Sequence, residues 1–171
     1  MIAGVVYTLL LVYAAVGDVR TRRIPNSLVL VLAIAGLGFS VLHVPPVEGA
    51  LRGVGGLFAG LLIWLPFYLL GWLGAGDVKL FAASGAWLGP ARAIEGAVIA
   101  ALAGALLALA WTMWKHGLKR VVENVWLATA APTVLATSAD SGRSRQTIPY
   151  GVALVVGALA AAWMPEIMPN L

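Results

Sequence analysis

Residues 1–23 read MIAGVVYTLLLVYAAVGDVRTRR, an uncharged apolar run that is followed by Asp18 and then by three arginines. A helix that spans a bilayer needs about 20 mostly apolar residues. In a secretory signal peptide the positive residues precede the apolar core, whereas here they follow it. The segment therefore predicts a retained membrane helix with its N-terminus outside and its arginines anchored at the cytoplasmic side.

The composition of the whole chain extends this prediction. Of 171 residues, 61% are hydrophobic and only 11% are charged, whereas about a quarter of the residues in soluble proteins are charged. This excludes a water-soluble globule. The chain has no cysteine, and His43 and His116 stand far apart, so we expect no disulfide, no metal site and no cofactor. The excess of basic residues is interpreted as cytoplasmic anchors and not as a nucleic-acid surface.

The predicted fold is all-α, a polytopic membrane helix bundle of about six transmembrane helices forming a single domain over 1–171. The apolar runs place the spans at about 1–17, 28–43, 53–73, 78–89, 94–114 and 148–164, with a cytoplasmic loop at 115–147. This topology puts nine of the eleven Lys and Arg inside and both termini outside. The run 78–89 would cover only about 18 Å of a roughly 30 Å core. We keep it as a crossing because the charge rule then places the cations after 114 inside.

Three local patterns give further structural expectations. Residues 24–27, Ile-Pro-Asn-Ser, should end one helix and cap the next through Asn26 or Ser27. The glycine-rich stretch from Gly53 to Gly60 lies within a span, so it predicts close helix contacts and not a phosphate loop. Apolar residues at helical spacing from Leu118 to Ala128 predict a surface helix within the loop.

Two of the three aspartates, Asp18 and Asp77, stand where an apolar span meets the cytoplasmic interface. Ionisable groups at this depth are costly, which favours a functional role. Two carboxyls that share one site resist double ionisation and hold one proton between them. Such a pair can activate water with its ionised member and protonate a substrate with the other. The pattern is typical of aspartic protease chemistry.

The residues around Asp77 allow more than one interpretation. Gly74 and Gly76 permit a substrate backbone to approach closely, but the same glycines are also ordinary at a helix C-terminus. Asp18 has the spacing of an interfacial ion pair with Arg22. Lys79 should face nearly opposite to Asp77 on a helix and act mainly as an anchor near lipid headgroups. We retain Gly74, Gly76 and Lys79 as candidates for lining the site.

Asp18, the segment Ile24-Pro25-Asn26, and residues 74–80, Gly-Ala-Gly-Asp-Val-Lys-Leu, together resemble the paired motifs of the type IV prepilin peptidases. These are membrane aspartic peptidases of the Gly-x-Gly-Asp class. Residues 148–151, Ile-Pro-Tyr-Gly, resemble the short members that serve tight-adherence pili. The resemblance implies that Asp18 and Asp77 are catalytic. It also implies that the substrate is a pilin-like precursor, whose short basic leader is removed at the cytoplasmic face of the inner membrane.

The chain departs from the longer members of that family in one respect. Those members carry a cytoplasmic insertion with paired Cys-x-x-Cys motifs and also methylate the new N-terminus, whereas this chain has no cysteine. We therefore predict an aspartic endopeptidase without methyltransferase activity. Two alternatives stay open: an archaeal preflagellin-type peptidase, and a non-catalytic membrane assembly or transport subunit.

Overall fold

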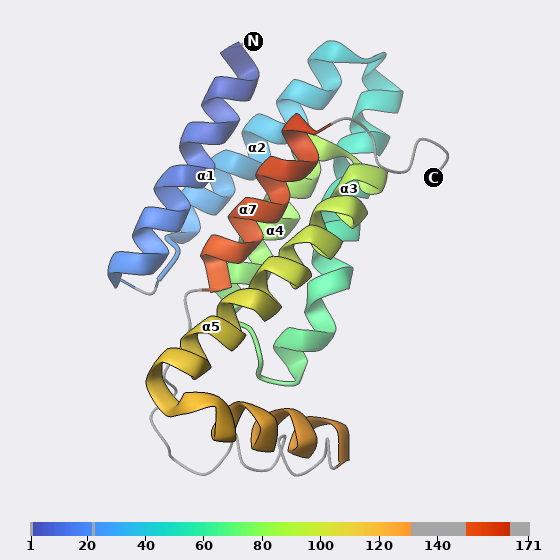
Figure 1. The fold of residues 1–171 in the computed structure, drawn as a ribbon. Coiled ribbons are helices and arrows are strands. Elements are labelled where there is room, and N and C mark those ends of the chain that lie inside the picture. Colours follow the sequence, from blue (N-terminus) through green and yellow to red (C-terminus); the bar gives the residue numbers. More distant parts are fainter. Residues whose placement is uncertain (1, 22, 131–149, 165–171) are drawn as a thin grey trace.

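The computed structural model describes residues 2–21, 23–130 and 150–164. The helices in these ranges are α1 (Ile2–Thr21), α2 (Asn26–His43), α3 (Pro46–Leu69), α4 (Ala75–Leu88), α5 (Pro90–Ala130) and α7 (Tyr150–Trp163). Helices and turns, and no strands, make up this part of the chain. Figure 1 shows that successive helices run in alternating directions and lie side by side as a bundle. The predicted all-α bundle is confirmed.

The lengths of the helices fit a multi-pass membrane protein. Helices α1, α2 and α3, with residues Pro90–Trp111 of α5, are long and apolar enough to cross a bilayer. Helices α4 and α7 have 14 residues each, which corresponds to about 21 Å. Helix α4 packs against α2, α3, α5 and α7, and every residue from Leu80 to Leu88 is buried. It is therefore the central helix of the bundle, and an apolar sequence without periodicity suits a helix that is enclosed on all sides.

Glycines bring α3 and α4 into backbone contact. A Cβ atom on Gly56 would overlap the carbonyl group of Gly85, and one on Gly60 would lie 2.8 Å from the carbonyl oxygen of Phe81. Small residues let helix backbones approach closely where lipid offers no hydrophobic driving force for association. The predicted role of the stretch from Gly53 to Gly60 in helix contacts is confirmed.

The two cations that the charge rule placed outside, Arg52 and Arg92, bind the ends of the two short helices. The guanidinium of Arg52 donates to the carbonyl oxygen of Leu88 at 3.3 Å, at the end of α4. That of Arg92 donates to the carbonyl oxygen of Ala161 at 2.7 Å, in the last turn of α7. The last carbonyls of a helix lack partners within it and favour a positive charge. These arginines therefore stabilise the C-terminal ends of α4 and α7.

One boundary differs clearly from the prediction. We expected a loop from 115, but α5 continues as a helix to Ala130, and Figure 1 shows that its last part turns away from the bundle. The predicted surface helix from Leu118 to Ala128 falls within this continuation. The rest of the predicted loop, the start of the last predicted span at Ile148 and the C-terminal residues 165–171 lie outside the described residues.

Candidate active site

The first candidate carboxyl, that of Asp18, lies on the packed face of α1. The buried residues of this helix are Tyr7, Leu11, Ala14 and Asp18, spaced by four, three and four positions, so they form one face of the helix. The first span was expected to end near 17, but α1 continues through Thr21 and carries Asp18 within it. Asp18 is 8% exposed, and its side chain points into the protein and not toward lipid.

The second candidate carboxyl, that of Asp77, is positioned by the turn between α3 and α4. Helix α3 ends at Leu69, and Gly71 adopts a φ of 73°, a left-handed conformation that glycine adopts without steric cost. Gly74 is not a C-cap, as one interpretation of the sequence had it, but the N-cap of α4. Its backbone N–H donates to Oδ2 of Asp77 at 3.2 Å. A carboxylate in the first turn accepts a bond in this way and fixes the start of the helix.

The two motifs meet at this turn. A Cβ atom on Gly76 would lie 3.4 Å from Cβ of Ile24, so Gly76 packs against the connection between α1 and α2. The ammonium of Lys79 donates to Oδ1 of Asn26 at 3.4 Å. The predicted cap by Asn26 or Ser27 is wrong, because Pro25 is the N-cap of α2 and no side chain caps it. The Asn26 side chain instead joins the two motifs.

A cavity of about 420 Å³ contains both candidate carboxyls. It is lined by residues from the end of α1, the connection to α2 and the start of α4: Asp18, Arg23, Ile24, Asn26, Gly74, Ala75, Gly76, Asp77 and Lys79. Lys79, one of the candidates for lining the site, lines the same cavity as Asp77, although it was expected to face nearly the opposite way, because its long side chain reaches round to Asn26. Among the described residues, no three His, Asp or Glu side chains are grouped so as to hold a metal ion.

The cavity changes the protonation of Asp77, which precedes the predicted span 78–89. Burial, and then the negative charge of Asp18, raise the pKa of Asp77 from the usual 3.8 to about 6, against the lowering effect of the bond from Gly74. Burial favours the neutral carboxyl, and a neighbouring like charge does the same. The two carboxyls therefore interact electrostatically, as expected of a pair that shares a proton.

Sequence reasoning missed one contributor to the site, the start of α7. The backbone N–H of Gly151 donates to Oδ2 of Asp18 at 3.0 Å in a buried setting. A Cβ atom at this position would lie 2.6 Å from that oxygen and 2.9 Å from Cγ. The pattern Pro149-Tyr150-Gly151 signals the start of a helix, but no local signal shows that this helix begins against Asp18.

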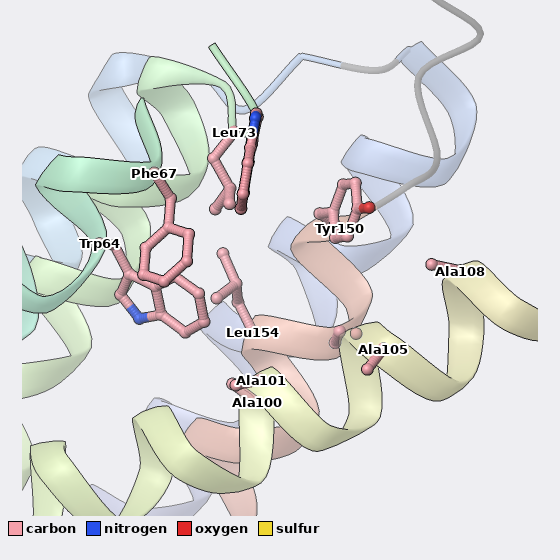
Figure 2. Close-up of a pocket in the computed structure, with 12 residues that line it drawn as sticks. Trp64, Phe67, Leu73, Ala100, Ala101, Ala105, Ala108, Tyr150 and Leu154 are labelled. Carbon is pink, nitrogen blue, oxygen red and sulfur yellow. The ribbon is translucent and has the colours of Figure 1, made fainter. Parts of the chain in front are cut away.

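A second, apolar cavity of about 180 Å³ lies between α3, α5 and α7. Figure 2 shows Trp64, Phe67 and Leu73 on one side, facing Leu154 and Tyr150 on the other. Two of its lining residues, Leu73 and Tyr150, directly precede Gly74 and Gly151, whose amides bind the two candidate carboxyls. Alanines of α5, among them the exposed Ala101 and Ala105, complete the wall.

Comparison with known proteins agrees with this arrangement. Residues 5–109 match the model of the type IV leader peptidase family. A prepilin leader peptidase/N-methyltransferase of Klebsiella pneumoniae is 40% identical over 90 residues, which are 50% of this chain and 39% of that protein. One of Burkholderia pseudomallei is 41% identical over 106 residues, 57% of this chain and 33% of that protein. One of Dickeya chrysanthemi is 37% identical over 99 residues, 55% of this chain and 35% of that protein.

The matched segments thus span between 33% and 39% of the length of these curated relatives. No solved structure gives a significant match to the chain. The family match takes in α1, α2, α3, α4 and the first half of α5, and with them both candidate carboxyls. Because this match extends over more than half of the chain, the protein belongs to the type IV leader peptidase family.

Proposed function

We propose that the protein is an aspartic endopeptidase that removes the short leader of type IV pilin-like precursors at the cytoplasmic face of the membrane. The observation that carries the proposal is the single cavity that Asp18 and Asp77 share, together with the raised pKa of Asp77. At pH values up to about 6 one carboxyl then holds a proton while the other is ionised, which is the state that aspartic peptidase chemistry requires. Gly74, Gly76 and Lys79 are proposed to line the substrate path.

The reaction follows from one protonated and one ionised carboxyl. The ionised carboxyl takes a proton from water, and the water oxygen forms a bond to the carbonyl carbon of the scissile peptide. The protonated carboxyl gives its proton to the carbonyl oxygen, and a neutral diol results. The first carboxyl then passes its proton to the peptide nitrogen, the C–N bond breaks, and one hydroxyl returns its proton to the second carboxyl. The pair ends in its starting state.

The apolar cavity supports an apolar substrate segment next to the scissile bond. Two lining residues, Leu73 and Tyr150, directly precede the glycines that bind the carboxyls, and the α5 wall is exposed at Ala101 and Ala105. We therefore infer that a precursor helix enters sideways from the bilayer. Its basic leader would stay among cytoplasmic water and anionic headgroups. The six-span topology with both termini outside, as a single domain in the cytoplasmic membrane, belongs to this proposal.

The test is cleavage of a synthetic pilin precursor by the purified full chain in lipid vesicles, followed by mass spectrometry. We expect the unmodified protein to release the leader and the variants Asp18→Asn and Asp77→Asn to be inactive while inserted and folded. Glu48→Gln is the matched control, because Glu48 is an exposed acid at the far end of α3 from Asp77. Substantial turnover by either aspartate variant would refute the assignment.

The same spectra test the absence of methyltransferase activity. We expect the mature product to keep an unmodified N-terminus when S-adenosylmethionine is supplied as the methyl donor, and cleavage to need no added cofactor. A product heavier by one methyl group would contradict this part of the proposal. A protein that inserts and folds but leaves every precursor intact would instead favour the non-catalytic alternative.

A further inference from the structure

The N-terminus of α7 and the carboxyl of Asp18 form a contact that the proposed chemistry has not used. Gly151 is the second residue of α7, so its N–H is among the first amides of the helix, which have no partner within it. This N–H donates to Oδ2 of Asp18, and the bond is buried. A hydrogen bond from a backbone N–H to a carboxylate stabilises the charged form, and the positive end of a helix dipole adds to that effect.

The contact also requires glycine. A Cβ atom at residue 151 would lie 2.6 Å from Oδ2, 2.9 Å from Cγ and 3.2 Å from Cβ of Asp18. Real Cβ atoms do not approach other heavy atoms so closely, so any side chain here would push the Asp18 carboxyl away from the amide. The first turn of α7 therefore lies directly against this carboxyl and holds it by the hydrogen bond from Gly151.

The surroundings of Asp77 differ. It also accepts one hydrogen bond from a backbone N–H, that of Gly74 at 3.2 Å. This donor belongs to the turn that precedes the helix of Asp77 itself. The other charged groups that line the cavity are Arg23, from the connection between α1 and α2, and Lys79, whose ammonium is bonded to Asn26. Tyr150, beside Gly151, lines the apolar cavity.

Resting on the proposed peptidase function, we propose that Gly151 is a positioning residue that holds Asp18 as the ionised base, so that the shared proton resides on Asp77. In the reaction above, Asp18 then takes the proton from water and Asp77 gives its proton to the carbonyl oxygen. Gly151 touches neither water nor substrate in this role, and acts through the Asp18 carboxyl. Helix α7 thus becomes part of the site, although it begins 70 residues beyond Leu80, the end of the second aspartate motif.

The first test compares Gly151→Ala with Gly38→Ala in the vesicle assay across pH. A Cβ atom on Gly38 of α2 would meet nothing within 4 Å, so this control adds a methyl group to a helix of the bundle without reaching Asp18 or the apolar cavity. We expect Gly151→Ala to lose on the order of 100-fold in kcat. The acid side of its pH profile should move to higher pH, because the charged form of Asp18 has lost its donor. Gly38→Ala should keep both rate and profile.

Two results would overturn the inference while leaving the peptidase function intact. One is wild-type rate and pH profile in Gly151→Ala. The other is a uniform loss at every pH, in proportion to the folded fraction measured by size-exclusion chromatography, since that is what a purely structural glycine produces. If the unmodified protein cleaves no precursor, the proposed function is refuted, and the positioning role of Gly151 is refuted with it.

A second measurement locates the proton without reference to activity. The chain has three aspartates, so the Asp140→Asn protein labelled with ¹³C at the aspartate carboxyls gives two signals in detergent, which are assigned by their loss in Asp18→Asn and Asp77→Asn. Near pH 5 we expect the signal of Asp18 to be that of a carboxylate and the signal of Asp77 that of a protonated carboxyl. The reverse pattern would overturn the inference even if Gly151→Ala were inactive.

Discussion

Replacing Asp77 by asparagine is expected to stabilise the fold at alkaline pH, although it removes a proposed catalytic group. The pKa of Asp77 is raised from 3.8 to about 6 by burial and by the charge of Asp18. Well below pH 3.8 the carboxyl is protonated in the folded and the unfolded chain alike, and it costs the fold nothing. Between pH 3.8 and about 6 the unfolded chain ionises Asp77 while the folded chain keeps the proton, so the stability of the wild-type protein falls, and above about pH 6 the loss stays constant.

The size of the effect follows from the same shift. Each pH unit between the unfolded and folded pKa values corresponds to about 1.4 kcal/mol, so the interval from 3.8 to about 6 gives about 3 kcal/mol at pH 8. Asp77 is partly exposed, and solvent screening reduces this to about 2 kcal/mol. Asparagine does not titrate, and its side-chain oxygen still accepts the N–H of Gly74. The variant should therefore exceed the wild type by this amount at pH 8, by much less at pH 4, and not at all well below pH 3.8.

The assay is reversible unfolding in mixed detergent micelles at a series of pH values, with the difference in unfolding free energy between variant and wild type plotted against pH. Taking the difference cancels the titration of groups that the two proteins share. Glu48→Gln serves as the control, since Glu48 is an exposed acid remote from the site. An Asp77→Asn variant that is no more stable at pH 8, or whose advantage is equal at pH 4 and pH 8, would refute the reasoning.

Two further substitutions test the packing and the substrate path. Gly56→Ala should lower the free energy of unfolding by about 2 kcal/mol, because its Cβ would overlap the carbonyl group of Gly85. Gly38→Ala should be neutral, because a Cβ there meets nothing within 4 Å. Equal stability of the two variants would contradict the close contact between α3 and α4. Ala105→Phe should raise KM for the precursor with little change in kcat by filling the apolar cavity, and an unchanged KM would remove that cavity from the substrate path.

The helical class of the fold follows from composition, but the packed face of each helix does not. In α1 the buried face carries Tyr7, Leu11 and Ala14, while Leu9 and Val12 are exposed. All of these residues are apolar, because lipid and protein interior are equally dry, so no polar stripe marks the outer side. Only Asp18 differs chemically from the rest. Its position at the end of α1 was visible in the sequence, whereas its orientation required tertiary structure.

The start of α4 is a second feature that the sequence predicted only in part. The glycines and Asp77 were expected to form a break in the chain near the inner interface, but Gly74 was open to interpretation as the end of one helix or the start of the next. The structure decides this through Gly71, whose φ of 73° ends α3 three residues earlier than Gly74 would. A glycine pattern indicates that a turn is present, but not which glycine takes the left-handed conformation.

The convergence of Asp18 and Asp77 depends on helices that carry neither carboxyl. In the described part of the chain, α1 packs against α2 and α7, and α4 packs against α2, α3, α5 and α7. Helices α2 and α7 therefore join α1 to α4. At the site, α2 supplies Asn26, which binds Lys79, and α7 supplies the amide of Gly151, which binds Asp18. A substitution in either contact should alter the distance between the two carboxyls although it changes neither aspartate. The separation of Asp18 and Asp77 in space is therefore a consequence of the whole bundle.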